Sequence, residues 1–65
     1  MAEKILRDTY GRPIGSIQVD SRGVQTLRDV RGRIKGTYDP QRDVTMEPNG
    51  RIYGWGNLLM MLLND

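Results

Sequence analysis

The segment Leu-Arg-Asp-Val-Arg-Gly-Arg-Ile-Lys-Gly, residues 27–36, decides the fold, because the chain contains it more than once. Residues 6–15 read Leu-Arg-Asp-Thr-Tyr-Gly-Arg-Pro-Ile-Gly, so the two segments share the string Leu-Arg-Asp-x-x-Gly-Arg-x-x-Gly. A third segment, residues 46–54, reads Met-Glu-Pro-Asn-Gly-Arg-Ile-Tyr-Gly and keeps the glycine–arginine pair and the final glycine. This repetition predicts three copies of one local structure.

Each copy places an acidic residue three positions before a glycine, which is the chemistry of a tight turn. An aspartate at the first position of a type I turn bonds the backbone two residues on, and glycine accepts a positive φ at the last position. Such a turn is a common hairpin connection. A weaker copy of the unit occupies residues 20–23. The predicted turn residues are therefore Asp8, Gly11, Asp20, Gly23, Asp29, Gly32, Asn49 and Gly50.

Short runs rich in β-branched and aromatic residues separate these turns, as is typical of strands. The predicted strands are residues 4–7, 12–19, 24–28, 33–38, 43–46 and 51–55, with a fifth turn at residues 39–42. Glycines within the predicted strands, Gly15, Gly36 and Gly54, indicate bends or close backbone contacts. We therefore predict a mainly β single domain over residues 1–65: a twisted or rolled antiparallel meander of six short strands over residues 1–56, followed by a helix.

The last nine residues form an apolar segment, which we call the tail (residues 57–65). Asn57 is a favourable N-cap, and the leucines and methionines after it are strong helix formers. A helix that is apolar on every side must be buried on every side. We expect an oligomer interface made by Leu58, Leu59, Met60, Met61, Leu62 and Leu63.

Leucines four apart share one face of a helix, so the tail leucines are expected to divide between two faces. One face would pack on the protein's own sheet and the other on a neighbouring copy, with Leu59 or Leu62 directed at that copy. The result would be a dimer or a pair of dimers. The alternative that stays open is a rolled sheet that covers the helix within one chain.

Composition limits the chemistry available to this chain of 65 residues. It has no histidine and no cysteine, which removes the commonest general base, the thiolate nucleophile and the usual zinc ligands. Four carboxylates are already explained as turn residues. We therefore expect no enzyme, no cofactor and no metal site. The longest apolar run, residues 58–63, is too short for a membrane span and the first residues are not a signal peptide, so we expect a cytoplasmic protein without a membrane partner.

The turn units bear a resemblance to known repeat proteins. Residues 29–34 and Thr37-Tyr38-Asp39 resemble short versions of the Tyr-Asp repeats of large bacterial shell-forming proteins. Over residues 5–56 the pattern also resembles small bacterial proteins built from β-hairpin repeats, sometimes called β-flower proteins, whose function is uncharacterised. The resemblance implies a β-repeat architecture and no particular activity.

The arginines suggest a second function. Eight of the ten cationic residues are arginine, in a chain of formal net charge +2. A sheet face with arginines and aromatic rings is suited to single-stranded nucleic acid. Strict alternation would put Ile34 and Gly36 on one face, and Tyr53 and Trp55 together on one side of the last strand. The candidate nucleic-acid face consists of Arg31, Arg33, Lys35, Arg51, Tyr53 and Trp55. The first hypothesis remains a small structural or protein-interaction module that associates with itself, or docks into a larger assembly, through the tail.

Overall fold

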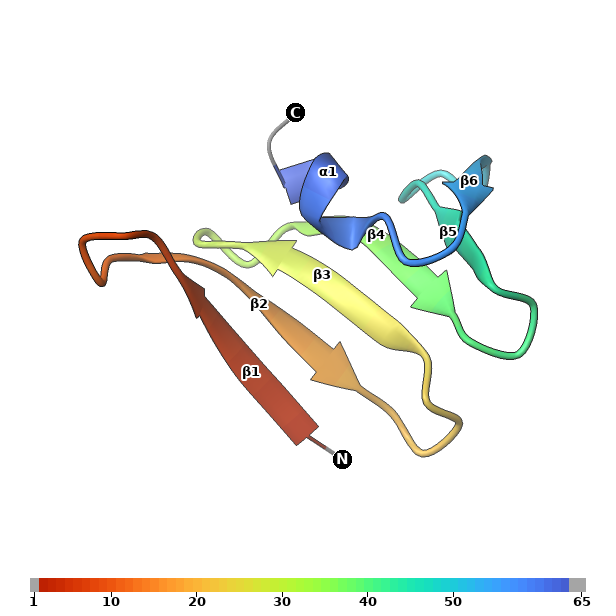
Figure 1. The fold of residues 1–65 in the computed structure, drawn as a ribbon, viewed down its shortest axis with the longest axis horizontal. Helices are drawn as coiled ribbons and strands as arrows, with labels where there is room; N and C mark the ends of the chain where they lie inside the picture. The colour runs from red at the N-terminus through yellow and green to blue at the C-terminus, as the bar shows by residue number, and fades with distance from the viewer. Residues whose placement is uncertain (1, 64–65) are drawn as a thin grey trace.

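The chain folds into a six-stranded antiparallel sheet with a short helix on one face (Figure 1). A computed structural model describes residues 2–63, so residues 64 and 65 of the predicted tail lie outside the described residues. The elements are β1 (Ala2–Arg7), β2 (Pro13–Val19), β3 (Gln25–Asp29), β4 (Ile34–Asp39), β5 (Val44–Met46), β6 (Ile52–Trp55) and α1 (Leu59–Leu63). The predicted meander is confirmed, and its strand ends differ from the predicted ones by at most two residues.

The strands lie in the sheet in the order in which they occur along the chain, each antiparallel to the next. The sheet is open, with β1 at one edge and β6 at the other. Figure 1 shows that it bends, so that β5 and β6 rise beside α1 while the helix lies above β3 and β4. We refer to the side that carries α1 as the inner face and to the opposite side as the outer face.

Four of the turns repeat one backbone arrangement. In the first, the amide of Asp8 donates to the carbonyl of Arg12, and the amide of Gly11 donates to the carbonyl of Asp8, each over 3.0 Å. The same pair of bonds closes the turns that begin at Asp20, Asp29 and Glu47. The glycines of these turns have φ between 82° and 91°. The predicted positive φ of Gly11, Gly32 and Gly50 is therefore confirmed.

Each of the three repeated hairpins contains a bulge just before its mid-strand glycine. Leu6 pairs with Gly15 but Arg7 pairs with Pro13, so the intervening residue of β2 has no partner position. The strand register of the β3–β4 and β5–β6 hairpins shifts by one residue at Lys35 and at Tyr53. A bulge opposes two residues to one and bends the strand, which accounts for the curvature expected from the glycines.

The bulges make two of the predicted side-chain positions wrong. Ile34 pairs with Arg28 and is 44% exposed, whereas Gly36 lies against the helix, so these two residues face opposite sides. Tyr53 packs against the core, whereas Trp55 pairs with Val44 and is 72% exposed. The physical reason is the same in both strands: one inserted residue shifts the alternation by one position.

The core lies between the inner face and the helix. Its buried members are Leu6, Leu27, Leu59 and Leu62. Ile14, Ile17, Tyr38, Tyr53 and Leu63 pack against them. Leu27 and Leu59 are completely buried, so the helix supplies half of the buried cluster.

Candidate functional site

The tail crosses the inner face and places one leucine over the mid-strand glycine of each hairpin. Leu58 lies over Gly54 of β6, Leu62 over Gly36 of β4 and Leu63 over Gly15 of β2. A Cβ atom at Gly15 would stand 3.1 Å from Cδ1 of Leu63. The three glycines therefore leave the space that the leucines occupy.

Two side chains fix the start of the helix. The hydroxyl of Thr45, which is completely buried, accepts a hydrogen bond from the amide of Leu58 over 2.9 Å and donates one to the carbonyl of Gly56 over 2.7 Å. The Asn57 side-chain oxygen accepts a bond from the amide of Leu59 over 3.3 Å, so the predicted N-cap residue bonds the first turn. These bonds satisfy amides that a helix start leaves without helical partners.

The tail leucines do not divide between two faces as expected. Leu59 is completely buried and Leu62 is 5% exposed within a single chain, so neither is directed at a neighbouring copy. The residues exposed on α1 are Met60 and Met61, at 50% and 55%. The expectation about Leu59 and Leu62 is wrong because all four tail leucines pack on the chain's own inner face. Three of them lie above glycines, and Leu59 is buried in the core.

The cationic side chains gather at one end of the sheet rather than on one face. The turns that join β1 to β2, β3 to β4 and β5 to β6 all lie at this end (Figure 1). We call this group of seven cations, accompanied by three carboxylates, the basic rim. It consists of Arg7, Arg12, Arg28, Arg31, Arg33, Lys35 and Arg51.

Two hairpins of the basic rim hold their arginines in the same way. The Nε of Arg12 donates to Asp8 and that of Arg33 donates to Asp29, each over 3.0 Å. Arg7 donates to the carbonyl of Gly11, and the equivalent residue Arg28 donates to that of Gly32, each over 2.9 Å. Four of the six residues that the two copies of the string share therefore brace their own turn.

Two of the turn aspartates, Asp8 and Asp29, have lowered pKa values. The amide of Arg12 donates to the carboxylate of Asp8 and lowers its pKa, and the amide of Tyr10 and the side chain of Arg12 act in the same direction. The pKa of Asp29 is lowered first by the amide of Arg33 and then by the side chain of that arginine. Partial burial opposes both shifts.

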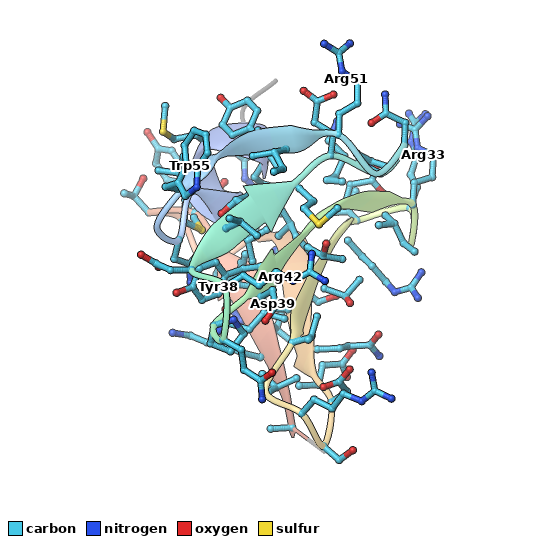
Figure 2. All side chains as sticks on the ribbon, turned by 90° about the vertical axis from the view of Figure 1, so that its right-hand side faces the viewer. Arg33, Tyr38, Asp39, Arg42, Arg51 and Trp55 are labelled. Atoms are coloured by element: carbon cyan, nitrogen blue, oxygen red, sulfur yellow. The ribbon has the colours of Figure 1, made fainter. Side chains whose placement is uncertain are left out.

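The candidate nucleic-acid face is divided. Figure 2 shows Arg33 and Arg51 together at one end of the sheet and Trp55 at the other. Register places Trp55 opposite Val44, the first residue of β5, whereas Arg51 directly follows the turn that joins β5 to β6. Because Tyr53 packs inward, neither predicted aromatic residue lies with the arginines on one face.

Sequence reasoning missed an aromatic residue that does lie among the rim cations. Tyr10 is 82% exposed in the first turn, and the guanidinium carbon of Arg12 lies 5.3 Å from the centre of its ring. This distance is that of a cation–π contact. Its position two residues after Asp8 in the repeated string was the available signal.

A hydrogen bond that sequence reasoning also missed lies at the turn between β4 and β5. Asp43 has a φ of 56°, and its carboxylate accepts a hydrogen bond from the hydroxyl of Tyr38 over 2.8 Å. This bond, followed by partial burial, raises the pKa of Tyr38. Arg42 pairs with Asp39 at 3.7 Å beside it (Figure 2). The hydroxyl and its aspartate brace this turn.

The chain matches no known family model, no curated protein and no solved structure. Over residues 2–63, no three histidine, cysteine, aspartate or glutamate side chains come close enough together to hold a metal ion. No helix in the same part of the chain has the length and apolar character needed to cross a membrane.

Proposed function

We propose that this protein is a small, non-enzymatic interaction module of the cytoplasm that associates with itself through the exposed side of its tail. The observation that carries the proposal is the pair Met60 and Met61, each about half exposed on a helix whose leucines are already covered by the chain's own sheet. Methionine is flexible and fills irregular apolar contacts. This surface takes the place of the leucine interface expected from the sequence.

A second copy of the chain is the occupant that the tail fits best. Residues 59–63 carry no charged side chain, so two helices meet without repulsion. A chain this short buries only about 60% of its unfolded surface, and covering two more methionines in each copy would stabilise the fold. Because each copy offers the same patch, a two-fold contact is the simplest, giving a dimer or tetramer. The resemblance of the turn units to β-hairpin repeat proteins remains a hypothesis. A structural role of this kind would be consistent with it.

The test compares sedimentation of the intact chain with that of a Met60→Glu/Met61→Glu variant over a range of concentrations. We expect the intact chain to exceed its monomer mass of 7.4 kDa and the variant to shift toward the monomer. Val30→Glu, which charges a similarly exposed apolar residue in the β3–β4 turn, is the control and should associate normally. Equal association of the double variant would refute the tail contact, as would an intact chain that is monomeric throughout.

A second candidate function is binding of single-stranded nucleic acid, and the basic rim with Tyr10 is the observation that favours it. Affinity for a mixed oligonucleotide would then fall steeply with salt, and Arg31→Ala/Arg51→Ala should lower the slope of the log–log plot by about 2 if both arginines contact phosphates. Arg42→Ala, at the opposite end of the sheet, is the control. Binding that ignores salt, or that responds equally to all three arginines, would count against this function.

A further inference from the structure

Strand β1 is the longer and less protected edge of the sheet. It contains six residues, Ala2–Arg7, and within residues 2–63 it pairs only with β2. The other edge, β6, has four residues, contains a bulge and leads directly into the tail. The unpaired backbone groups of an edge strand can bind a strand of another chain unless charges, bulges or a covering segment prevent it. Strand β1 is therefore a candidate site for pairing with another strand.

In β1, the backbone amide and carbonyl groups of every second residue point away from β2, toward the free edge of the sheet. The amide of Asp8 donates to the carbonyl of Arg12 across the turn. Because backbone groups alternate in direction along a strand, those of Leu6 and Lys4 also point toward β2. The groups left without a strand partner belong to Glu3, Ile5 and Arg7. Their side chains share the outer face of the sheet, because Leu6 between them packs into the inner core.

We propose that β1 pairs antiparallel with β1 of a second copy, with Ile5 opposite Ile5 and Glu3 opposite the partner's Arg7. The two copies would then form one continuous twelve-stranded sheet around a two-fold axis. Ile5 is 47% exposed in the single chain and would be covered at the centre of the contact. The opposite charges of Glu3 and Arg7 would flank it on both sides, and opposite-charge cross-strand pairs are favourable.

The charge pattern selects this register. In a two-fold edge contact each face continues into the same face of the partner, so outer-face residues meet only outer-face residues. A contact centred on Glu3, Lys4 or Arg7 opposes two like charges at its centre. A contact centred on Leu6 places Ile5 opposite an arginine. Only the register centred on Ile5 gives one apolar pair and two pairs of opposite charge.

The same charges restrict the edge to this partner. Lys4 projects to the inner face and in this register lies opposite the partner's Leu6, a buried residue without charge, so this pair opposes no like charges. A strand without matching charges would instead leave Glu3 and Arg7 opposed by apolar or like-charged residues. Charged residues on an edge commonly act in this way against unwanted pairing.

This inference deepens the proposed self-association by adding a second contact of a different kind. The two-fold axis of the β1 contact is perpendicular to the sheet, whereas a tail-to-tail contact packs two sheets face to face around an axis parallel to them. Perpendicular two-fold axes that intersect close a pair of dimers without leaving free ends. The two contacts together would account for a tetramer.

Charge reversal tests the β1 contact. We expect Glu3→Arg alone and Arg7→Glu alone each to raise the dissociation constant measured by sedimentation by about tenfold or more, because each opposes like charges twice in the dimer. The double variant Glu3→Arg/Arg7→Glu should restore association to within about threefold, because it restores both pairs. Arg28→Glu is the matched control: it loses the same kind of bond to a turn carbonyl but lies away from the edge. Failure of the double variant to recover association, with its circular dichroism unchanged, would overturn the proposal.

Amide exchange provides a second measurement that does not depend on variants. The amides of Glu3, Ile5 and Arg7 should become protected as concentration rises, whereas those of Lys4 and Leu6 should be protected throughout. Rapid exchange at Ile5 in the associated protein would also overturn the proposal. Repeating both measurements in the Met60→Glu/Met61→Glu background separates the two contacts, because loss of the tail contact alone leaves the β1 dimer intact.

Discussion

Leu62 lies over Gly36 so closely that a Cβ atom at position 36 would overlap the Cδ1 atom of the leucine. The same Cβ would stand 2.8 Å from the carbonyl oxygen of Met46 on the neighbouring strand. Position 36 is therefore limited to glycine by a side chain above it and by backbone beside it. The equivalent glycine of the third hairpin, Gly54, meets only the side chain of Leu58, at 2.5 Å.

This difference predicts unequal effects of alanine at the two glycines. Gly36→Ala should lower the free energy of unfolding by about 1–3 kcal/mol, because the Met46 carbonyl belongs to a strand and cannot move aside. Gly54→Ala should cost less, below about 1 kcal/mol, because the end of the partly buried Leu58 side chain can rotate away. Urea denaturation of the two variants measures both values. Equal losses would show that the leucines are not seated on the glycines as described.

The turn glycines allow a prediction in which packing plays no part. Gly11, Gly32 and Gly50 have φ of 82°, 86° and 91°, and no atom lies within 4 Å of a Cβ at any of them. Alanine at each should cost roughly 1–2 kcal/mol from left-handed backbone strain alone. Asparagine, which tolerates this conformation, should cost less at the same position. Denaturation midpoints that do not distinguish alanine from asparagine would contradict this account.

The turns could be predicted from the sequence because their chemistry is local. An acidic residue, a glycine and two hydrogen bonds between nearby backbone groups fix each turn without help from the rest of the fold. The meander followed, since turns of this length leave the strands they join no arrangement other than antiparallel neighbours. The bulges could not be predicted in the same way. The bulged residues Lys35 and Tyr53 occupy variable positions of the repeated string, so the string does not indicate that the alternation of side chains between the two faces shifts there.

The orientation of the tail lay beyond the sequence for a different reason. Six consecutive apolar residues have no polar face, so periodicity does not indicate which side of the helix meets the sheet. The spacing of the glycines on three separate strands decides it, and that spacing exists only after the sheet has formed. The side-chain positions at Leu62 and Met61 therefore follow from tertiary structure alone.

The lowered pKa values of Asp8 and Asp29 predict how stability changes in acid. A carboxyl group with a lower pKa in the folded state stabilises the fold above its unfolded pKa of about 3.9, and this contribution is lost as the pH falls through the folded value. The melting temperature should therefore decrease when the pH is lowered below about 4.

The variant Asp8→Asn/Asp29→Asn should show a smaller drop. Asparagine can still accept the turn amides, as Asn49 accepts the amide of Arg51 over 3.0 Å, but it does not titrate. Glu47→Gln, which neutralises a carboxylate away from strand β1, is the control and should keep most of the acid response. An acid profile unchanged in the double variant would mean that the turn aspartates do not govern it.

Thr45 occupies the position that leucine holds in the first two hairpins, opposite the mid-strand glycine, and its hydroxyl connects the sheet to the start of the helix. Thr45→Val keeps the shape of the side chain but removes both bonds, leaving the amide of Leu58 without its partner. A part-buried amide that loses its acceptor costs about 1–3 kcal/mol. Thr45→Ser keeps the hydroxyl and loses only a methyl group, so it is the matched control for the two bonds. We expect valine to destabilise the protein more than serine and to speed amide exchange in α1 more than in β2 and β3, because the loss falls where the tail joins the sheet. Uniform acceleration across the chain, or a valine variant as stable as the parent, would mean that the leucines alone hold the helix in place.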